Sequence, residues 1–309
     1  MDAMQSMLLT FLADNQQLSI PIYQRRYRWN IEQCEQLWED IIKVGEKGKN
    51  NPDTHFIGSV VYMSSGANFA AVIPKRLIID GQQRITTVTL LISALAMFLK
   101  ENPILEDADS EDLLFYYLSN SKAKGEEKYK IILNDEDKNT VKKIIDNISS
   151  PEEISFDNDK DSLRIIENFK YFKNRINKSN VNSLYIGLLK LVIIQISLEY
   201  GKDNPQLIFE SLNSTGLELN KADLIRNYIL MGLEPEEQID IYNKYWEDMD
   251  KGFENTNYFD LFIRDYLTIK LHRIPVMYKV YSEFKNYSKN WDNIEDLVKD
   301  ISKYSKYFF

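Results

Sequence analysis

The chain has 309 residues and a formal net charge of −9. Non-specific nucleic-acid binding is therefore not driven by the charge of the whole chain, although a local basic patch could still bind a phosphate chain. A single cysteine and two widely separated histidines, His55 and His272, exclude an internal disulfide and a metal site built from several Cys and His ligands. Glycine and proline are scarce, which favours a helix-rich fold. Because the N-terminus lacks a signal peptide and the apolar stretches are shorter than a membrane span, we expect a cytoplasmic protein that contacts no membrane.

Apolar residues at helical spacing predict a first helix over residues 3–13. An extended segment follows over residues 18–24, and Pro21 restricts it to the edge of a sheet. The next helix is expected to begin after Asn30 as N-cap, with Gln33 placed to complete a capping box. Its apolar face contains the single cysteine, Cys34, which should therefore be unreactive.

Two strands are predicted next, at 56–62 and 72–79, and they should pair as sheet neighbours. A helix over 85–100 follows the second strand. Residues 101–190 resemble a helical insertion with acidic, Asn-rich loops. The β-branched run 191–198 predicts a strand in a central position of the sheet.

The second half of the chain is expected to be helical. Asn204-Pro205 is typical of a helix start, and Asn220 is expected to cap the helix after it. From Pro235 onward the pattern is helical and rich in aromatic residues. The chain ends within an amphipathic run, which suggests part of a longer protein.

The turn between the second predicted strand and its helix is the main candidate for chemistry. A helix N-terminus attracts phosphate, and Gly81 would let a ligand approach closely. Arg84 could fork onto phosphate oxygens, and Asp80 could hold Mg²⁺ or orient an attacking water. Gln82 and Gln83 could position that water or contact the ligand. The alternative is a tight turn whose polar residues cap the helix.

A second candidate is the stretch 23–29, where arginines alternate with aromatic residues. Arg with Tyr and Trp suits stacking on bases and contact with phosphates. The alternative is a solvated basic edge whose aromatic side chains pack in the core, and this is favoured when the stretch is considered alone. Its candidate residues are Tyr23, Gln24, Arg25, Arg26 and Arg28.

A third candidate lies between two predicted helices. Asn213 and Gly216 fit a loop that contacts a ligand, whereas Asp223 more simply caps the following helix. Arg226 and Asn227 lie one turn further, where they either face the same cleft or form a solvated helix surface. The minor candidates are His55, Glu210, Asp223 and Arg226.

These stretches match one family together, in order and in spacing. They are residues 20–29 (IPIYQRRYRW), 79–87 (IDGQQRITT) and 209–216 (FESLNSTG) with 219–227, and 55–59 (HFIGS) adds a weaker match. The chain resembles the N-terminal domain of GmrSD-type, modification-dependent restriction enzymes and their relatives in phosphorothioate-sensing phage defence. The motifs span about residues 5–230.

The resemblance implies a helix-rich α+β fold with a small ParB/sulfiredoxin-like mixed-sheet core. It implies a domain over 1–232, split by the helical insertion at about 101–190. Residues 233–309 would then be a helical segment, expected to begin a C-terminal domain.

The resemblance also implies a function. Asp80 to Arg84 would hydrolyse GTP or another nucleoside triphosphate with Mg²⁺ or another divalent cation, and Thr86 and Thr87 would join Gly81, Asn213 and Gly216 in nucleotide binding. The stretch from Tyr23 to Arg25, with Arg26 and Arg28, would form the pocket mouth and help to sense modified DNA. Relatives carry a C-terminal nuclease domain with a His- and Asn-containing motif, but only His272 follows residue 230 here.

Three functions remain open on the sequence. The first is a nucleotide-hydrolysing regulatory domain of a phage-defence restriction system. The second is a binding module that holds nucleotide or modified DNA without turnover and regulates a separate nuclease. The third is a nuclease, which the missing motif and the acidic charge make the least favoured. The expected partners are a nucleoside triphosphate, modified DNA and a nuclease domain or subunit, and a homo-oligomer stays open.

Overall fold

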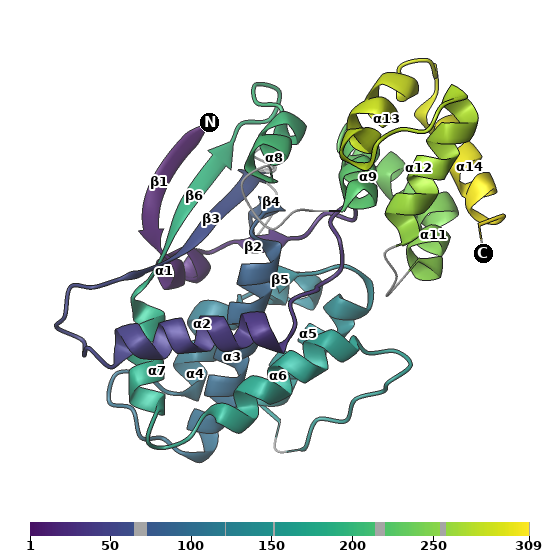
Figure 1. Ribbon diagram of the computed structural model, residues 1–309. Coiled ribbons are helices and arrows are strands. Elements are labelled where there is room, and N and C mark those ends of the chain that lie inside the picture. Colours follow the sequence, from purple (N-terminus) through teal and green to yellow (C-terminus); the bar gives the residue numbers. More distant parts are fainter. Residues whose placement is uncertain (65–72, 121, 151, 214–219, 254–257, 309) are drawn as a thin grey trace. The chain divides into compact units, whose positions relative to one another are not determined.

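The computed structural model describes the chain except for residues 65–72, 121, 151, 214–219, 254–257 and 309 (Figure 1). Its contacts divide the chain into two compact units. Unit 1 comprises Met1–Pro21 and Arg26–Asp203, and unit 2 comprises Ile22–Arg25 and Asn204–Phe309. The division at Asp203 lies before residue 232, the boundary expected from the motifs.

Unit 1 is built on a mixed sheet and a layer of helices (Figure 1). Within the described residues the sheet has six strands, in the order β1 (Asp2–Met7), β6 (Leu191–Leu198), β3 (His55–Ser64), β4 (Lys75–Asp80), β2 (Gln17–Ser19) and β5 (Ile131–Ile132). Its helices are α1 (Leu8–Ala13), α2 (Ile31–Gly45), α3 (Gln82–Glu101), α4 (Ser110–Leu113), α5 (Asp135–Ile148), α6 (Leu163–Arg175) and α7 (Val181–Leu189), with a π-turn at Leu114–Leu118 and a 3₁₀ turn at Gly125–Lys128. The predicted helix-rich α+β class is confirmed.

Helix α3 is the centre of unit 1. It packs against α4, α5 and α6, and most of its apolar side chains are buried. In the described part of the chain it is the one helix long and apolar enough to cross a membrane by length and composition, but 78% of that window is buried inside the protein. Its apolar character is therefore explained by its place in the core.

Several local predictions are confirmed. Asn30 and Gln33 form the expected capping box of α2. Strands β3 and β4 pair antiparallel, and β6 lies in the interior of the sheet between β1 and β3. Asn204 accepts hydrogen bonds from the first turn of α8 (Pro205–Asn213), and the Asn220 side chain caps α9 (Lys221–Leu230).

Other predictions are wrong. Residues 3–7 belong to strand β1, and the helix begins only at Leu8, because β1 pairs antiparallel with β6 along its whole length. Strand β2 lies between β4 and β5 rather than at an edge. It ends at Ser19, before Pro21, so the missing N–H of proline breaks no ladder hydrogen bond. The insertion also contributes β5 to the sheet.

The regular elements of unit 2 among its described residues are helices, as predicted from Pro235 onward. Its core contains Tyr23 together with aromatic and aliphatic residues of the helices. Besides α8 and α9 it contains α10 (Pro235–Ile241), a π-turn at Tyr242–Trp246, α11 (Glu247–Gly252), α12 (Tyr258–Leu271), a 3₁₀ turn at Met277–Lys279, α13 (Val280–Ser288) and α14 (Ile294–Ser305).

Candidate functional site

The turn between β4 and α3 is made by Gly81, whose φ of +101° is in the left-handed region. A Cβ there would lie 3.1 Å from both the Ser59 carbonyl oxygen and a Val60 methyl group, so only glycine fits without strain. Helix α3 therefore begins at Gln82, directly after the strand and three residues earlier than predicted. The N–H groups of a first helical turn have no partners within the helix, and here they lie where the sheet ends.

Arg84 is held against β3 on one side and Asp80 on the other. Its Nη2 atom donates to the Ser59 carbonyl at 2.6 Å and to the Asp80 Oδ2 atom at 3.1 Å. Its Nε atom is buried and has no hydrogen-bond partner. The Asp80 and Arg84 side chains remain 29% and 26% exposed, so a ligand could reach both.

Gly58 makes room for this guanidinium. Its φ is +109°, and it lies where the register of β3 against β6 shifts between Phe56 and Ser59. A Cβ on Gly58 would lie 2.6 Å from Arg84 Nη1. The irregularity in β3 thus places a backbone without a side chain beside Arg84, as β-bulges near functional sites often do.

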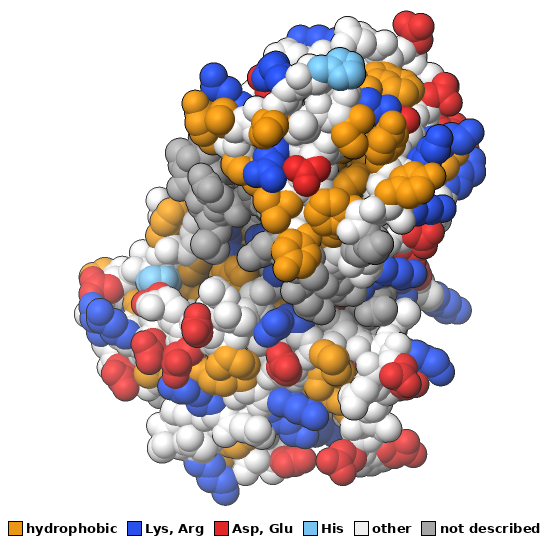
Figure 2. Space-filling model, turned by 45° about the vertical axis from the view of Figure 1, so that its right-hand side comes forward, with side chains coloured by type: hydrophobic (Ala, Val, Ile, Leu, Met, Phe, Trp, Pro, Cys, Tyr) orange, Lys and Arg blue, Asp and Glu red, His pale blue; other side chains and the backbone are white. Residues whose placement is uncertain are grey.

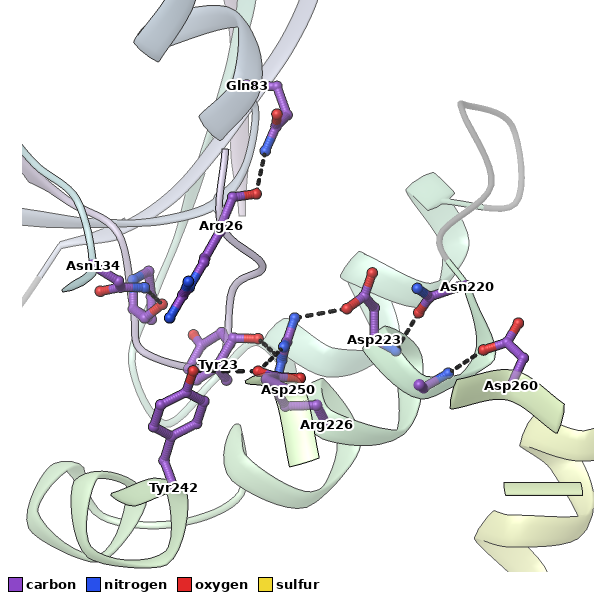
Figure 3. Close-up of polar contacts among 12 residues, drawn as sticks. Tyr23, Arg26, Gln83, Asn134, Asn220, Asp223, Arg226, Tyr242, Asp250 and Asp260 are labelled. Carbon is purple, nitrogen blue, oxygen red and sulfur yellow. Dashed lines mark hydrogen bonds and ion pairs between the residues drawn. The ribbon is translucent and has the colours of Figure 1, made fainter. Parts of the chain in front are cut away.

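Gln83 uses its side-chain amide on the backbone of the arginine-rich stretch. Its Oε1 atom accepts hydrogen bonds from Arg28 N at 2.7 Å and Trp29 N at 3.2 Å, and its Nε2 donates to Arg26 O at 3.4 Å (Figure 3). The arginine-rich stretch is therefore fixed to the first turn of α3. The backbone of Arg26 and Arg28 therefore lies at the turn, and the Gln83 side chain has a structural role.

The two threonines of the motif lie inside unit 1. Thr86 and Thr87 are both 0% exposed, so in this conformation neither hydroxyl is accessible to a ligand. Thr87 Oγ1 lies 2.6 Å from the Tyr27 hydroxyl, which also accepts a hydrogen bond from the Asn168 amide. Burial raises the pKa of the Tyr27 phenol well above its ordinary value. These contacts hold the arginine-rich stretch to the core.

Two of these partners were missed by the sequence analysis. Asn168 lies on α6, fully buried within an apolar stripe, and a polar residue at such a position was the available signal. The Asp137 carboxylate accepts a hydrogen bond from Tyr27 N at 2.7 Å. No local pattern marked Asp137.

The first part of the stretch, Ile22–Arg25, belongs to unit 2. The Tyr23 side chain is 4% exposed and packs in the core of that unit, which is the packing alternative considered for it. Burial raises the pKa of its phenol above the ordinary value. Gln24 and Arg25 are half-buried in unit 2, whereas in unit 1 Arg26 is half-buried and Arg28 is exposed.

Arg226 is the centre of a buried ionic cluster in unit 2 (Figure 3). Its Nη2 lies 2.8 Å from the Asp223 carboxylate, its Nη1 lies 2.6 Å from Asp250, and its Nε donates to the Tyr23 carbonyl at 2.9 Å. Burial alone would lower the pKa of the guanidinium, but Asp250 and Asp223 raise it above its ordinary value. The side chain is 4% exposed, so the solvated helix face considered for Arg226 is wrong.

Asp223 has a different role from the one favoured on the sequence. The cap of α9 is Asn220, whose Oδ1 accepts from Asp223 N at 2.6 Å, while the Asp223 carboxylate pairs with Arg226. Asp223 Oδ2 and Asn227 Oδ1 are buried without hydrogen-bond partners. Neither side chain is solvated.

Glu210 and His55 make contacts of their own. In unit 2, the Glu210 carboxylate accepts from Tyr281, Gln206 and Lys285; burial opposes its ionisation, but these hydrogen bonds lower its pKa. In unit 1, His55 Nε2 lies 3.5 Å from the Asp40 carboxylate, beside a surface cavity of about 580 Å³. Asn213 is the last residue of α8, and Gly216 lies outside the described residues.

The charges give no large basic face on the side of the molecule that Figure 2 shows, where Lys and Arg alternate with Asp and Glu. No group of three or more His, Cys, Asp or Glu side chains is arranged as a metal site among the described residues. Asp80 alone supplies a carboxylate at the turn. One carboxylate suits Mg²⁺ that arrives with a nucleotide, because this ion commonly takes one or two carboxylates together with phosphate oxygens and water.

Comparison with known proteins gives a family for the chain. A search of curated proteins found no match. The model of a family described as the GmrSD restriction endonuclease N-terminal domain matches residues 8–230, which include the Asp80–Arg84 turn, the arginine-rich stretch and α9. The chain therefore belongs to the GmrSD restriction endonuclease N-terminal domain family, and its role lies in a restriction system that defends against phage.

Proposed function

We propose that the turn from Asp80 to Arg84 binds a nucleoside triphosphate and hydrolyses it with Mg²⁺, as the regulatory, DNA-sensing part of a cytoplasmic restriction system. The observation that carries the proposal is the arrangement of Gly81, Arg84 and Asp80 at the N-terminus of α3. Backbone N–H groups, a guanidinium and a carboxylate lie at one helix end, which together match phosphate and its metal ion.

Each residue has a separate part in this proposal. Phosphate oxygens would accept hydrogen bonds from the N–H groups of the first turn of α3. The positive φ before this turn favours glycine, and Gly81 has no side chain that would block the phosphate. Arg84 would neutralise phosphate charge, and Asp80 would supply an oxygen ligand to Mg²⁺. Gln82, at the first helical position of α3, would orient the attacking water, whereas the Gln83 amide is engaged with the backbone.

The ion pair between Asp80 and Arg84 suggests how the site is kept ready. In this structure the two side chains hold each other at 3.1 Å. A phosphate with Mg²⁺ would replace that pair by two stronger ones, guanidinium with phosphate and carboxylate with metal. Catalysis would then consist of positioning and charge stabilisation, as is usual for phosphoryl transfer.

Phosphate release with Mg²⁺ tests the proposal. We expect hydrolysis that falls by about 10²–10³-fold in Asp80→Ala and in Arg84→Ala, the size found when one charge-stabilising group is removed. Arg164→Ala is the matched control, because Arg164 forms a similar but exposed pair with Glu167 in unit 1. Absence of hydrolysis, or hydrolysis that survives both substitutions, contradicts the proposal.

A second function is favoured by the commitment of Gln83 to the backbone. The turn could hold nucleotide or modified DNA without turnover and regulate a nuclease domain or subunit. Arg28 is exposed on the stretch that Gln83 fixes, and it could contact a DNA phosphate. Titration of labelled, modified DNA at several salt concentrations tests this function, since phosphate contacts weaken steeply as salt rises. Binding without phosphate release supports it, and a response independent of salt contradicts the DNA contact.

A further inference from the structure

The chain passes between the two units three times. It leaves unit 1 after Pro21, contributes Ile22–Arg25 to unit 2, and returns at Arg26 before the final passage after Asp203. We call Ile22–Arg25 the crossing segment. Four residues span at most about 14 Å when fully extended, so the crossing segment is short.

Both ends of the crossing segment are fixed in unit 1. Before it, the Asn134 side-chain amide donates to the Pro21 carbonyl at 2.7 Å. After it, Gln83 accepts from Arg28 N and Trp29 N and donates to Arg26 O. Gln83 belongs to the first turn of α3, so the second end is fixed to the proposed nucleotide site itself.

The middle of the crossing segment is fixed in unit 2. The Tyr23 ring is buried in the core of that unit, and its carbonyl accepts a hydrogen bond from Arg226. Arg226 is in turn held by Asp223 on its own helix and by Asp250 on α11. A displacement of the Tyr23 backbone would therefore disturb a buried charge cluster, which is costly because buried charges depend on their partners.

We propose that the crossing segment transmits the state of the α3 N-terminus to unit 2, with Gln83 as the positioning residue at one end and Arg226 as the anchor at the other. A ligand that shifts the first turn of α3 moves Gln83 and with it Arg26 to Trp29. Because the segment is short, the shift reaches the Tyr23 carbonyl and the cluster around Arg226. The inference rests on the proposed function only for the identity of that ligand.

Amide hydrogen exchange on the full chain, without nucleotide, tests the coupling directly. Gln83→Met keeps the length of the side chain and removes all three hydrogen bonds, whereas Gln83→Glu keeps the acceptor for Arg28 N and Trp29 N. We expect Gln83→Met to speed exchange at these two amides by at least about tenfold and to speed exchange in α9 as well. Gln83→Glu should leave α9 close to the parent protein.

The reverse experiment starts in unit 2. Arg226→Lys keeps the charge but loses the Nε donor to the Tyr23 carbonyl, and we expect faster exchange at Arg28 and Trp29. Asp260→Ala is the control, because the Asp260 carboxylate accepts a hydrogen bond from Ala222 N at the start of the same helix. It should speed exchange in α9 alone.

Two results overturn the inference. One is faster exchange at residues 28 and 29 in Gln83→Met with α9 unchanged, and the other is no effect of Arg226→Lys beyond unit 2. If Gln83→Met does not fold, Arg226→Lys decides the question alone. Since no nucleotide is used, the coupling can fail while hydrolysis persists, or hold while hydrolysis is absent, so the two proposals fail separately.

Discussion

Gly58→Ala is the sharpest perturbation of the candidate site that the structure offers. The new methyl group would lie 2.6 Å from Arg84 Nη1, and the backbone would keep a φ of +109° that L-residues rarely adopt. The guanidinium cannot simply swing aside, because it is bonded to the Ser59 carbonyl and to Asp80. The substitution therefore costs both backbone strain and the contacts of Arg84.

The magnitude follows from these two costs. Backbone strain at a positive φ costs about 1–3 kcal/mol. Losing the hydrogen bond between the charged guanidinium and the Ser59 carbonyl adds about 1.5–3 kcal/mol. The ion pair with Asp80 adds at most about 1 kcal/mol, because both side chains are partly exposed. We expect unit 1 to lose about 2.5–7 kcal/mol in total.

Gly48→Ala is the matched control for this experiment. Gly48 also has a positive φ, +83°, but a Cβ there would have no atom within 4 Å. Denaturant unfolding followed by a unit 1 probe should show that Gly48→Ala loses only the strain cost. In an Arg84→Ala background, Gly58→Ala should lower the unfolding free energy of unit 1 only by the strain cost expected for Gly48→Ala. Equal losses for the two glycines, or a loss at Gly58 that persists without Arg84, would refute the reasoning.

Three further predictions concern other parts of the chain. Burial raises the pKa of the Cys34 thiol to about 12, so the folded protein should resist alkylation at about pH 8 while the denatured chain reacts within minutes. The pKa of Glu210 is lowered in the folded state, so its carboxylate stabilises unit 2 at neutral pH, and this stabilisation is lost as the pH falls through that pKa. Glu210→Gln should therefore reduce the fall in the unfolding free energy of unit 2 between about pH 6 and pH 3. A Cβ on Gly187 would lie 2.1 Å from the Ile41 carbonyl oxygen across the contact of α7 with α2, so Gly187→Ala should lower the midpoint of thermal unfolding by several degrees, whereas Gly232→Ala, with no atom within 4 Å, should not.

Local sequence signals predicted the features whose partners are close in the chain. The capping box of Asn30 and Gln33 spans three residues, and Asn204 and Asn220 cap the turns that directly follow them. The turn at Gly81 was recognised for the same reason. Such features depend on the backbone geometry of a single turn, and the residues that determine this geometry are neighbours in the sequence.

Features that depend on distant partners were mistaken or missed. The helical spacing of Met4 and Met7 predicted a helix, but these residues form β1 because they pair with β6, which lies about 190 residues later in the sequence. Gln83 was expected to face a ligand, but its partners are backbone atoms about 55 residues earlier. Asp250, which neutralises Arg226 from 24 residues away, gave no local signal.

The burial of Tyr23 in unit 2 also makes the segment before residue 230 depend on the residues after it. The family match ends at residue 230, yet the core around Tyr23 is completed by residues such as Trp246 and Phe262, and the charge of Arg226 is balanced by Asp250. A different segment joined after Leu230 would leave the apolar core around Tyr23 incomplete and the buried Arg226 guanidinium without Asp250. Any segment that follows Leu230 therefore has to complete the core around Tyr23 and supply a counter-charge for Arg226.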